Sequence, residues 1–180
     1  MRRALIAAVM VVSAPALAQL VTFPGVGGGS GGVVVSTTGP VNLTGTTAET
    51  NLASLRIPAN SMGKNGVIEL KCLWSYTNSA NVKTHNYRWN NTPGGGVSIT
   101  SSGPTTTATA QAFLIIRNTN ATNVQVTYNT PLNPFGTSGG TPTTNLDTTQ
   151  DTWLNITGQL ALSTETLTLQ RATATVFPAP

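Results

Sequence analysis

Apolar and polar residues alternate with a period of two along much of the segment from Gly45 to Trp89. One stretch places Ile68, Leu70, Cys72 and Trp74 on one side of an extended strand and Val67, Glu69, Lys71 and Leu73 on the other. A later stretch alternates His85, Tyr87 and Trp89 with Thr84, Asn86 and Arg88. Alternation bounded by Gly, Pro and Asn is typical of half-buried antiparallel strands. We therefore predict that the set from Ile68 to Trp74 is buried together and faces the aromatic strand at Tyr87.

The same pattern predicts the other strands. They are expected at Val41–Leu43, 52–57, Val97–Ile99, Ala108–Arg117, Val124–Tyr128, Trp153–Leu160 and Thr166–Phe177. The fourth and fifth of these are expected to pair as one hairpin, and the last two as another, because short segments join them. The apolar positions of the last strand change parity, which predicts a β-bulge near Gln170 and Arg171. No segment keeps a helical period, so the predicted fold class is all-β, an antiparallel β-sandwich of about eight or nine strands.

Residues 1–18 have the pattern of an export leader. Met1-Arg2-Arg3 is basic, Ala4–Val12 is apolar, and Ala16-Leu17-Ala18 has the small-residue spacing of a cleavage site. A Sec-type signal peptide cleaved after Ala18 is therefore predicted. The apolar run falls short of the ~20 residues that a membrane span needs, so no membrane span is expected. The alternative is an N-terminal plug that attaches the chain to a partner.

A glycine-rich linker is expected next, over residues 19–39. Its centre, VTFPGVGGGSGG, has the composition of a flexible linker. Val33–Val35, beyond this centre, is expected to be either a short strand or an attachment segment. Residues 40–180 are then predicted to form one β-sandwich domain. The ~160 residues that remain after cleavage suit a single domain with a short tail.

Composition narrows the class of function. Only 8% of the residues are charged, against ~25% in a typical globular protein. A polar surface built from Thr, Asn, Ser and Gly suits extracellular sandwiches and shells, and argues against a cytosolic enzyme. The formal net charge of +4 includes Arg2 and Arg3 of the leader, so +2 remains after cleavage. The remaining basic residues are scattered, and no nucleic-acid partner is predicted.

Residues that catalysis or metal binding would need are scarce. The chain has one histidine, one cysteine and five acidic residues. His85 is interpreted as a packed, hydrogen-bonded strand residue rather than a metal ligand. Cys72 is interpreted as a core residue, since free cysteine is among the most buried residue types. Asp147 and Asp151 are interpreted as turn formers, with a calcium site as the alternative. We predict no catalytic residue, no cofactor and no metal.

Two glycine-rich segments match enzyme motifs in spacing alone. G-x-S-x-G occurs at Gly28–Gly32 and at Gly136–Gly140, but a nucleophile elbow needs a buried strand before the serine and a helix after it. Gly27, Gly29 and Gly32 fit G-x-G-x-x-G with no βαβ unit around them. None of these matches is interpreted as a site.

Two aromatic residues are the candidates for ligand binding. Trp89 ends a strand beside Asn90–Pro93, where its ring could form a stacking platform, and a core position is the alternative. Tyr128 ends another predicted strand. An open aromatic cleft lined by Trp89 or Tyr128 would indicate glycan binding. Trp74 and Trp153 lie within strand patterns and are interpreted as core residues.

The order of these segments resembles a known family. The phrases are TGTTAET at 44–50, IPAN at 57–60, LWSYTNSAN at 73–81 and KT at 83–84. This order is similar to a jelly-roll module of bacteriophage virion proteins, which occurs in tail, fibre and head-decoration components and in their prophage copies. The match is best over Val41–Arg88 and returns at Thr152–Leu160 and Thr166–Leu169.

The resemblance implies a jelly-roll β-sandwich with a non-enzymatic structural or adhesive role, displayed outward on a phage or prophage particle. Because similar modules are commonly trimers, it also implies a homo-oligomer, with a homotrimer favoured. Other virion proteins and a cell-surface glycan are the implied partners. The alternative function is an exported bacterial carbohydrate-binding or surface-adhesion module, which the leader favours. The expected location is the virion or the cell exterior.

Self-association is also predicted from the residues themselves. Val67 and Leu73 alternate opposite to Trp74, so they are expected on the outer face of the sandwich. Contiguous apolar surface on a soluble protein usually marks an interface. The low charge also implies weak repulsion between copies.

Overall fold

The structure is a computed structural model, and it describes residues 18–22, 32–129 and 143–180. In chain order its strands are β1 (Ala18–Thr22), β2 (Val33–Thr37), β3 (Val41–Leu43), β4 (Thr50–Ile57), β5 (Val67–Tyr76), β6 (Lys83–Asn90), β7 (Val97–Ser102), β8 (Thr109–Asn118), β9 (Gln125–Asn129), β10 (Thr143–Thr144), β11 (Thr152–Leu160) and β12 (Leu167–Phe177). In these ranges we find no helix long and apolar enough to cross a membrane. Residues 1–17, where an export leader is predicted, lie outside the described residues.

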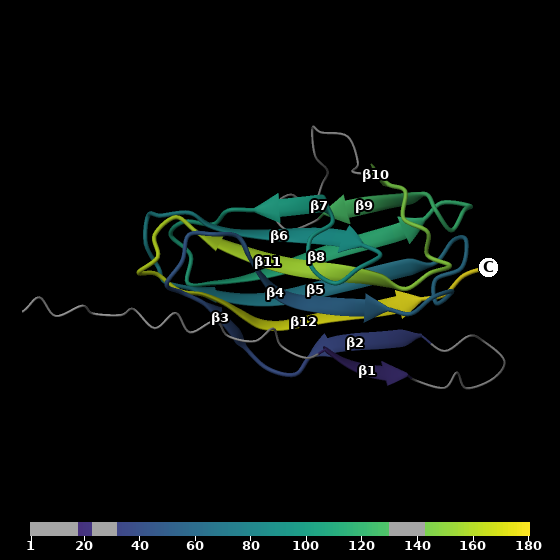
Figure 1. Ribbon diagram of the computed structural model, residues 1–180, viewed down its shortest axis with the longest axis horizontal. Helices are drawn as coiled ribbons and strands as arrows, with labels where there is room; N and C mark the ends of the chain where they lie inside the picture. Colours follow the sequence, from purple (N-terminus) through teal and green to yellow (C-terminus); the bar gives the residue numbers. More distant parts are fainter. Residues whose placement is uncertain (1–17, 23–31, 130–142) are drawn as a thin grey trace, which may run out of the picture.

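Two antiparallel sheets pack face to face around one core (Figure 1). The larger sheet has the order β1-β2-β12-β5-β8-β9-β10, with β3 also paired to β12, and the smaller has the order β4-β11-β6-β7. Strand β12 therefore pairs with β2 and β3, β11 with β4, β8 with β5, and β7 with β6. These nested pairs describe one long hairpin rolled into two sheets, which is the jelly-roll topology. The predicted fold class is confirmed.

The two predicted hairpins have different outcomes. Strands β8 and β9 pair as expected, and the register of β12 shifts between Leu169 and Arg171, where the bulge was predicted. Strands β11 and β12 lie in different sheets, so the prediction that they form a hairpin is wrong. In a jelly roll the last strands pair with strands from the start of the chain, and the segment between β11 and β12 crosses from one sheet to the other.

The larger sheet begins before residue 40, where the domain was predicted to start. Strand β2 pairs with β12, and β1 pairs with β2 at the edge of the sheet. Val35 of β2 is buried in the core. The predicted linker 19–39 therefore contributes two strands to the sandwich, while its residues 23–31 lie outside the described ranges.

The inner face of β5 carries the residues that the alternation predicted. Ile68, Leu70, Cys72 and Trp74 are at most 1% exposed. Trp74 Nε1 donates a hydrogen bond of 2.9 Å to the hydroxyl of Tyr87 on β6, in the opposite sheet. The predicted burial of this set, and its position facing the aromatic strand, are confirmed. Burial also raises the pKa of the Cys72 thiol, which agrees with a core role.

Aromatic rings stack around His85 in this core. The imidazole lies parallel to the rings of Trp74 and Tyr76, with centroids 4.8 and 6.2 Å away, and meets the ring of Tyr87 edge-on at 5.5 Å. Burial lowers the pKa of His85 to about 4. The imidazole is therefore neutral at pH 7. The predicted packing of His85 is confirmed, but its Nδ1 is buried without a hydrogen-bond partner, so the predicted hydrogen bonding is not borne out at this atom.

Candidate functional site

Trp89 and Tyr128, the two aromatic candidates, lie in opposite environments. Trp89 on β6 is fully buried between the sheets. Because a ring without exposed surface cannot stack on a ligand, the hypothesis of a platform at Trp89 is corrected to its alternative, a core position. Tyr128 on β9 is 46% exposed. It lies on the outer side of the larger sheet, paired with Ile115.

The tryptophan that reaches the surface is Trp153, which the sequence placed in the core. It is half-buried on β11, between Arg56 of β4 and Asn90 of β6. Leu154, Ile156 and Leu160 have the opposite parity to Trp153 and are buried. Their spacing indicates that Trp153 points outward, and the prediction of a core position for Trp153 is wrong.

Glu49 organises the outer face of the smaller sheet. Its carboxylate accepts hydrogen bonds of 2.9 Å from Nε and Nη2 of Arg88, one of 3.0 Å from Asn86, and a further one from the hydroxyl of Thr157. The hydrogen bonds from Arg88 are the main cause that lowers the pKa of Glu49 to about 2. This carboxylate is ionised and surrounded by donors, so it is a brace between strands and a poor general base.

Asn155 fastens the loop after β6 to the same face. Its side chain is 1% exposed. Its Oδ1 accepts hydrogen bonds from the Gly94 amide at 2.8 Å and from the Ser54 hydroxyl at 2.6 Å, and its Nδ2 donates to the Gly95 carbonyl at 3.0 Å. The loop follows Asn90, the strand partner of Trp153. The ring of Trp153 thus lies at an end of the sheet that polar contacts hold in place.

The outer face of the larger sheet is more apolar; we call it the apolar face. It comprises Val67, Leu73, Phe113, Ile115, Val126, Tyr128 and Phe177, with the charged residues Glu69, Lys71, Arg117 and Arg171 among them. Leu73 is 45% exposed and Phe177 is 47% exposed, whereas Val67 is half-buried. The predicted outward positions of Val67 and Leu73 are confirmed. Contiguous apolar surface of this kind is typical of contact sites.

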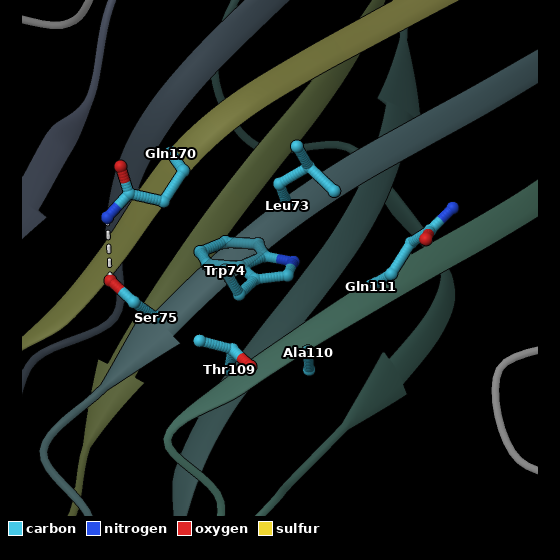
Figure 2. Close-up of a pocket in the computed structure, with 7 residues that line it drawn as sticks. All are labelled: Leu73, Trp74, Ser75, Thr109, Ala110, Gln111 and Gln170. Atoms are coloured by element: carbon cyan, nitrogen blue, oxygen red, sulfur yellow. Dashed lines mark hydrogen bonds between the residues drawn. The ribbon is translucent and has the colours of Figure 1, made fainter.

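A shallow depression opens at one end of this face (Figure 2). It is lined by Leu73, Trp74, Ser75, Thr109, Ala110, Gln111 and Gln170. Gln170 occupies the bulge of β12, and its side-chain amide donates a hydrogen bond of 2.7 Å to the Ser75 hydroxyl. The lining contains amides, hydroxyls and apolar groups but no acid, histidine or cation. Such a surface can contact a neutral partner and offers no general acid or base.

Ser79 and Lys83 are close enough for a serine nucleophile and a lysine base. Lys83 Nζ lies 2.5 Å from the Ser79 hydroxyl, which donates to the Glu165 carboxylate. Nζ also donates to the carbonyl of Asn81 at 2.7 Å and lies 3.6 Å from Glu165 Oε2. In a serine–lysine nucleophile the hydroxyl donates its proton to the amine, whereas here Nζ donates to the Ser79 hydroxyl and that hydroxyl donates to Glu165. The cluster is therefore a buried ion pair that joins two loops.

The acidic candidates take up structural roles. Asp147 accepts hydrogen bonds from the amide and hydroxyl of Thr149, as a turn former does. Asp151 accepts two hydrogen bonds from Arg56 and one from the Ala59 amide. Within the part of the chain that the structure describes, no three His, Cys, Asp or Glu side chains gather as metal ligands. The G-x-S-x-G match at Gly136–Gly140 and nearly all of the earlier one lie outside that part.

No protein-family model matches the chain, and no curated protein matches it. Among solved structures, the chain is similar to winged bean acidic lectin complexed with methyl-α-D-galactose. This match has 10% identity, covers 92% of this chain and 93% of the lectin, and has a TM-score of 0.33.

Two other solved structures are similar at the same level. One is a chain of infectious bursal disease virus, Gx strain, with 9% identity over 89% of this chain and 32% of the viral chain, and a TM-score of 0.34. The other is the family 7 alginate lyase A1-II′, with 11% identity over 81% of this chain and 77% of the lyase, and a TM-score of 0.29. Likenesses this distant say nothing of function, and the assignment of the fold rests on the strand order.

Proposed function

We propose that the chain is a non-enzymatic structural or adhesive component of a phage or prophage particle, in the tail, a fibre or the head decoration, displayed outward and present in several copies. The observation that carries this proposal is the apolar face, where Leu73, Tyr128 and Phe177 are each nearly half exposed. Apolar surface of this extent suits assembly with other subunits. The jelly-roll topology and the resemblance over Val41–Arg88 support the same role.

The absence of an enzymatic role is part of the proposal. In residues 18–22, 32–129 and 143–180, the carboxylates of Glu49, Asp147, Asp151 and Glu165 accept hydrogen bonds from neighbouring groups, and the carboxylate of Glu69 lies 3.7 Å from the Lys71 ammonium. The single histidine is buried among aromatic rings. General acid–base catalysis needs a titratable group within reach of a substrate, and these groups are committed to structural contacts.

Particles released from the producing strain after prophage induction should contain the protein. Mass spectrometry of gradient-purified particles tests this expectation, and an antibody against the protein should decorate the particles in electron micrographs. The N-terminal peptide also decides the fate of the leader. A terminus at Gln19 supports export after cleavage, whereas Met1 retained in particles supports an attachment plug. Recovery of the protein only in the particle-free medium would contradict the virion role.

Carbohydrate binding is the second candidate, and the position of Trp153 favours it. Its half-buried ring lies on a polar outer face beside Arg56 and Asn90. A protein surface that combines an aromatic ring with amide and guanidinium donors suits the apolar and hydroxyl-bearing sides of a sugar.

Glycan-array binding followed by titration calorimetry tests this candidate. If the polar face binds a sugar, Trp153→Ala should weaken the interaction at least tenfold, while Tyr128→Ala, on the other sheet, should leave it unchanged. If Tyr128→Ala abolishes sugar binding and Trp153→Ala does not, the binding site lies on the apolar face instead. A protein that binds no glycan leaves the virion role as the single proposal.

A further inference from the structure

The apolar face is arranged in four rungs, which are rows of residues in register across β12, β5 and β8. In order they are Phe177, Val67 and Arg117; Thr175, Glu69 and Ile115; Thr173, Lys71 and Phe113; and Arg171, Leu73 and Gln111. Side chains stand roughly perpendicular to a sheet, and stacked sheets lie ~10 Å apart. A second sheet placed on this face would therefore meet it rung by rung.

We propose that the apolar face binds the same face of a second copy of the chain, in a two-fold symmetric dimer. The inference rests on the proposed function, which requires several copies, and it names the surface and the partner. The two-fold axis lies between the facing larger sheets of the two copies and runs perpendicular to their strands. It passes between the rung of Glu69 and the rung of Lys71. With this axis, each strand of one copy lies opposite the same strand of the other copy, and the two run in opposite directions.

The charges of the two central rungs complement each other under this symmetry. Glu69 of one copy lies opposite Lys71 of the other, and Lys71 lies opposite Glu69. Within one chain these two side chains are 3.7 Å apart, and Lys71 Nζ also lies 5.3 Å from the centroid of the Phe113 ring. Glu69 is 31% exposed and Lys71 is 54% exposed, so both reach the surface where a partner would lie. Opposite charges across an interface fix its register and exclude wrong pairings.

The apolar residues match in the same arrangement. Ile115 of one copy lies opposite Phe113 of the other, because these residues occupy the same two rungs on β8. On the outer rungs, Val67 lies opposite Leu73 on the neighbouring copy. Phe177 lies opposite Arg171, whose guanidinium can cover the ring in a cation–π contact. No like charges face each other in this dimer.

An axis parallel to the strands gives a different result. It would place Glu69 against Glu69 and Lys71 against Lys71 on β5, the central strand of the face. Like charges in direct opposition are destabilising. The charge pattern therefore selects the axis perpendicular to the strands.

The size of the face is adequate for a stable dimer. Strands β12, β5 and β8 have 11, 10 and 10 residues, and β2 and β9 flank them. Strands β2 and β9 have 5 residues each. Three long and two short strands cover ~630 Å², which is at the lower end of the area that each partner contributes to a standard interface. Two sheets packed face to face in this way would resemble the interior of a β-sandwich.

Substitutions that reverse the charges of Glu69 and Lys71 test the dimer directly. The oligomeric state of the purified protein is measured by sedimentation velocity at about 10 μM. The wild type should sediment as a dimer. Glu69→Lys places cations against each other, and Lys71→Glu places anions against each other. The dissociation constant of the dimer should therefore be at least tenfold higher in each variant than in the wild type. The double variant Glu69→Lys/Lys71→Glu should regain the dimer. An equimolar mixture of the two single variants should form a heterodimer, because each supplies the charges that the other lacks.

Lys64→Glu, in the exposed turn before β5, is the matched control and should remain a dimer. A monomeric wild type, or a trimer, would overturn the proposal, as would a dimer that Glu69→Lys leaves intact or single variants that fail to combine. Circular dichroism confirms that each variant is folded. The particle experiment does not depend on this interface, so the failure of the dimer and the failure of the virion role are separate results.

Discussion

Replacement of Lys83 by methionine should lower the free energy of unfolding by about 3–5 kcal/mol, the usual cost of breaking a buried ion pair from one side. The Lys83 side chain is fully buried. Its ammonium group donates to the Ser79 hydroxyl at 2.5 Å and to the Asn81 carbonyl at 2.7 Å. Methionine is similar in length but has no donor, so these acceptors and the Glu165 carboxylate would be left buried without a cation.

Urea denaturation followed by tryptophan fluorescence at pH 7 measures this effect. Lys64→Met is the matched control, because Lys64 is exposed, and its transition should stay near that of the wild type. Adding Glu165→Gln to Lys83→Met should recover part of the lost stability, since no unpaired carboxylate then remains. If Lys83→Met unfolds at the same urea concentration as the Lys64→Met control, the cluster does not hold the two loops together.

Acidification from pH 6.5 to 4 should lower the free energy of unfolding by about 3 kcal/mol through His85 alone, at about 1.4 kcal/mol for each pKa unit. Burial lowers the pKa of His85 from 6.5 to about 4. Between these values the unfolded chain binds a proton at His85 and the folded chain does not, so acid favours unfolding. The rings of Trp74, Tyr76 and Tyr87 pack against the imidazole.

His85→Phe keeps an aromatic ring in the stack and removes the titrating group. Urea midpoints measured from pH 7 to 4 should therefore fall much less in this variant than in the wild type. Glu49 affects the free energy of unfolding over a lower pH range, because its pKa is about 2 in the folded protein and its ordinary value is 4.5. Its contribution is present above pH 4.5 and is lost as the pH falls toward 2, so both proteins should lose stability there. Parallel curves between pH 6.5 and 4.5 would contradict the role of His85.

The inward or outward direction of several strands could be read from the sequence because it depends on local spacing. Ile68, Leu70, Cys72 and Trp74 were predicted to share the core, since a period of two puts them on one face whatever the partner strand is. The bulge near Gln170 followed from a parity change within one strand. The same period puts Trp153 on the face opposite to Leu154, Ile156 and Leu160, so its outward position was also readable from the spacing. The prediction that Trp153 lies in the core followed the residue type instead of the parity, and it is wrong.

Local alternation along the chain was enough to predict the antiparallel strands, the residues of β5 that enter the core, and the position at which β12 changes register. The pairing of strands was decided only in the tertiary structure. Strands β11 and β12 are neighbours in the chain, yet they lie in different sheets because each pairs with a strand from the first half of the chain. Such long-range pairings leave no local spacing to detect.

The polar clusters were likewise decided by the tertiary structure. Glu49 meets Thr157, and Lys83 meets Glu165, only after strands distant in the chain come together. The rungs of the apolar face arise in the same way, since the register of β5 against β8 and β12 sets which charges and apolar groups lie side by side. Alternation along a strand specifies the face of each residue, and only pairing between strands specifies its neighbours.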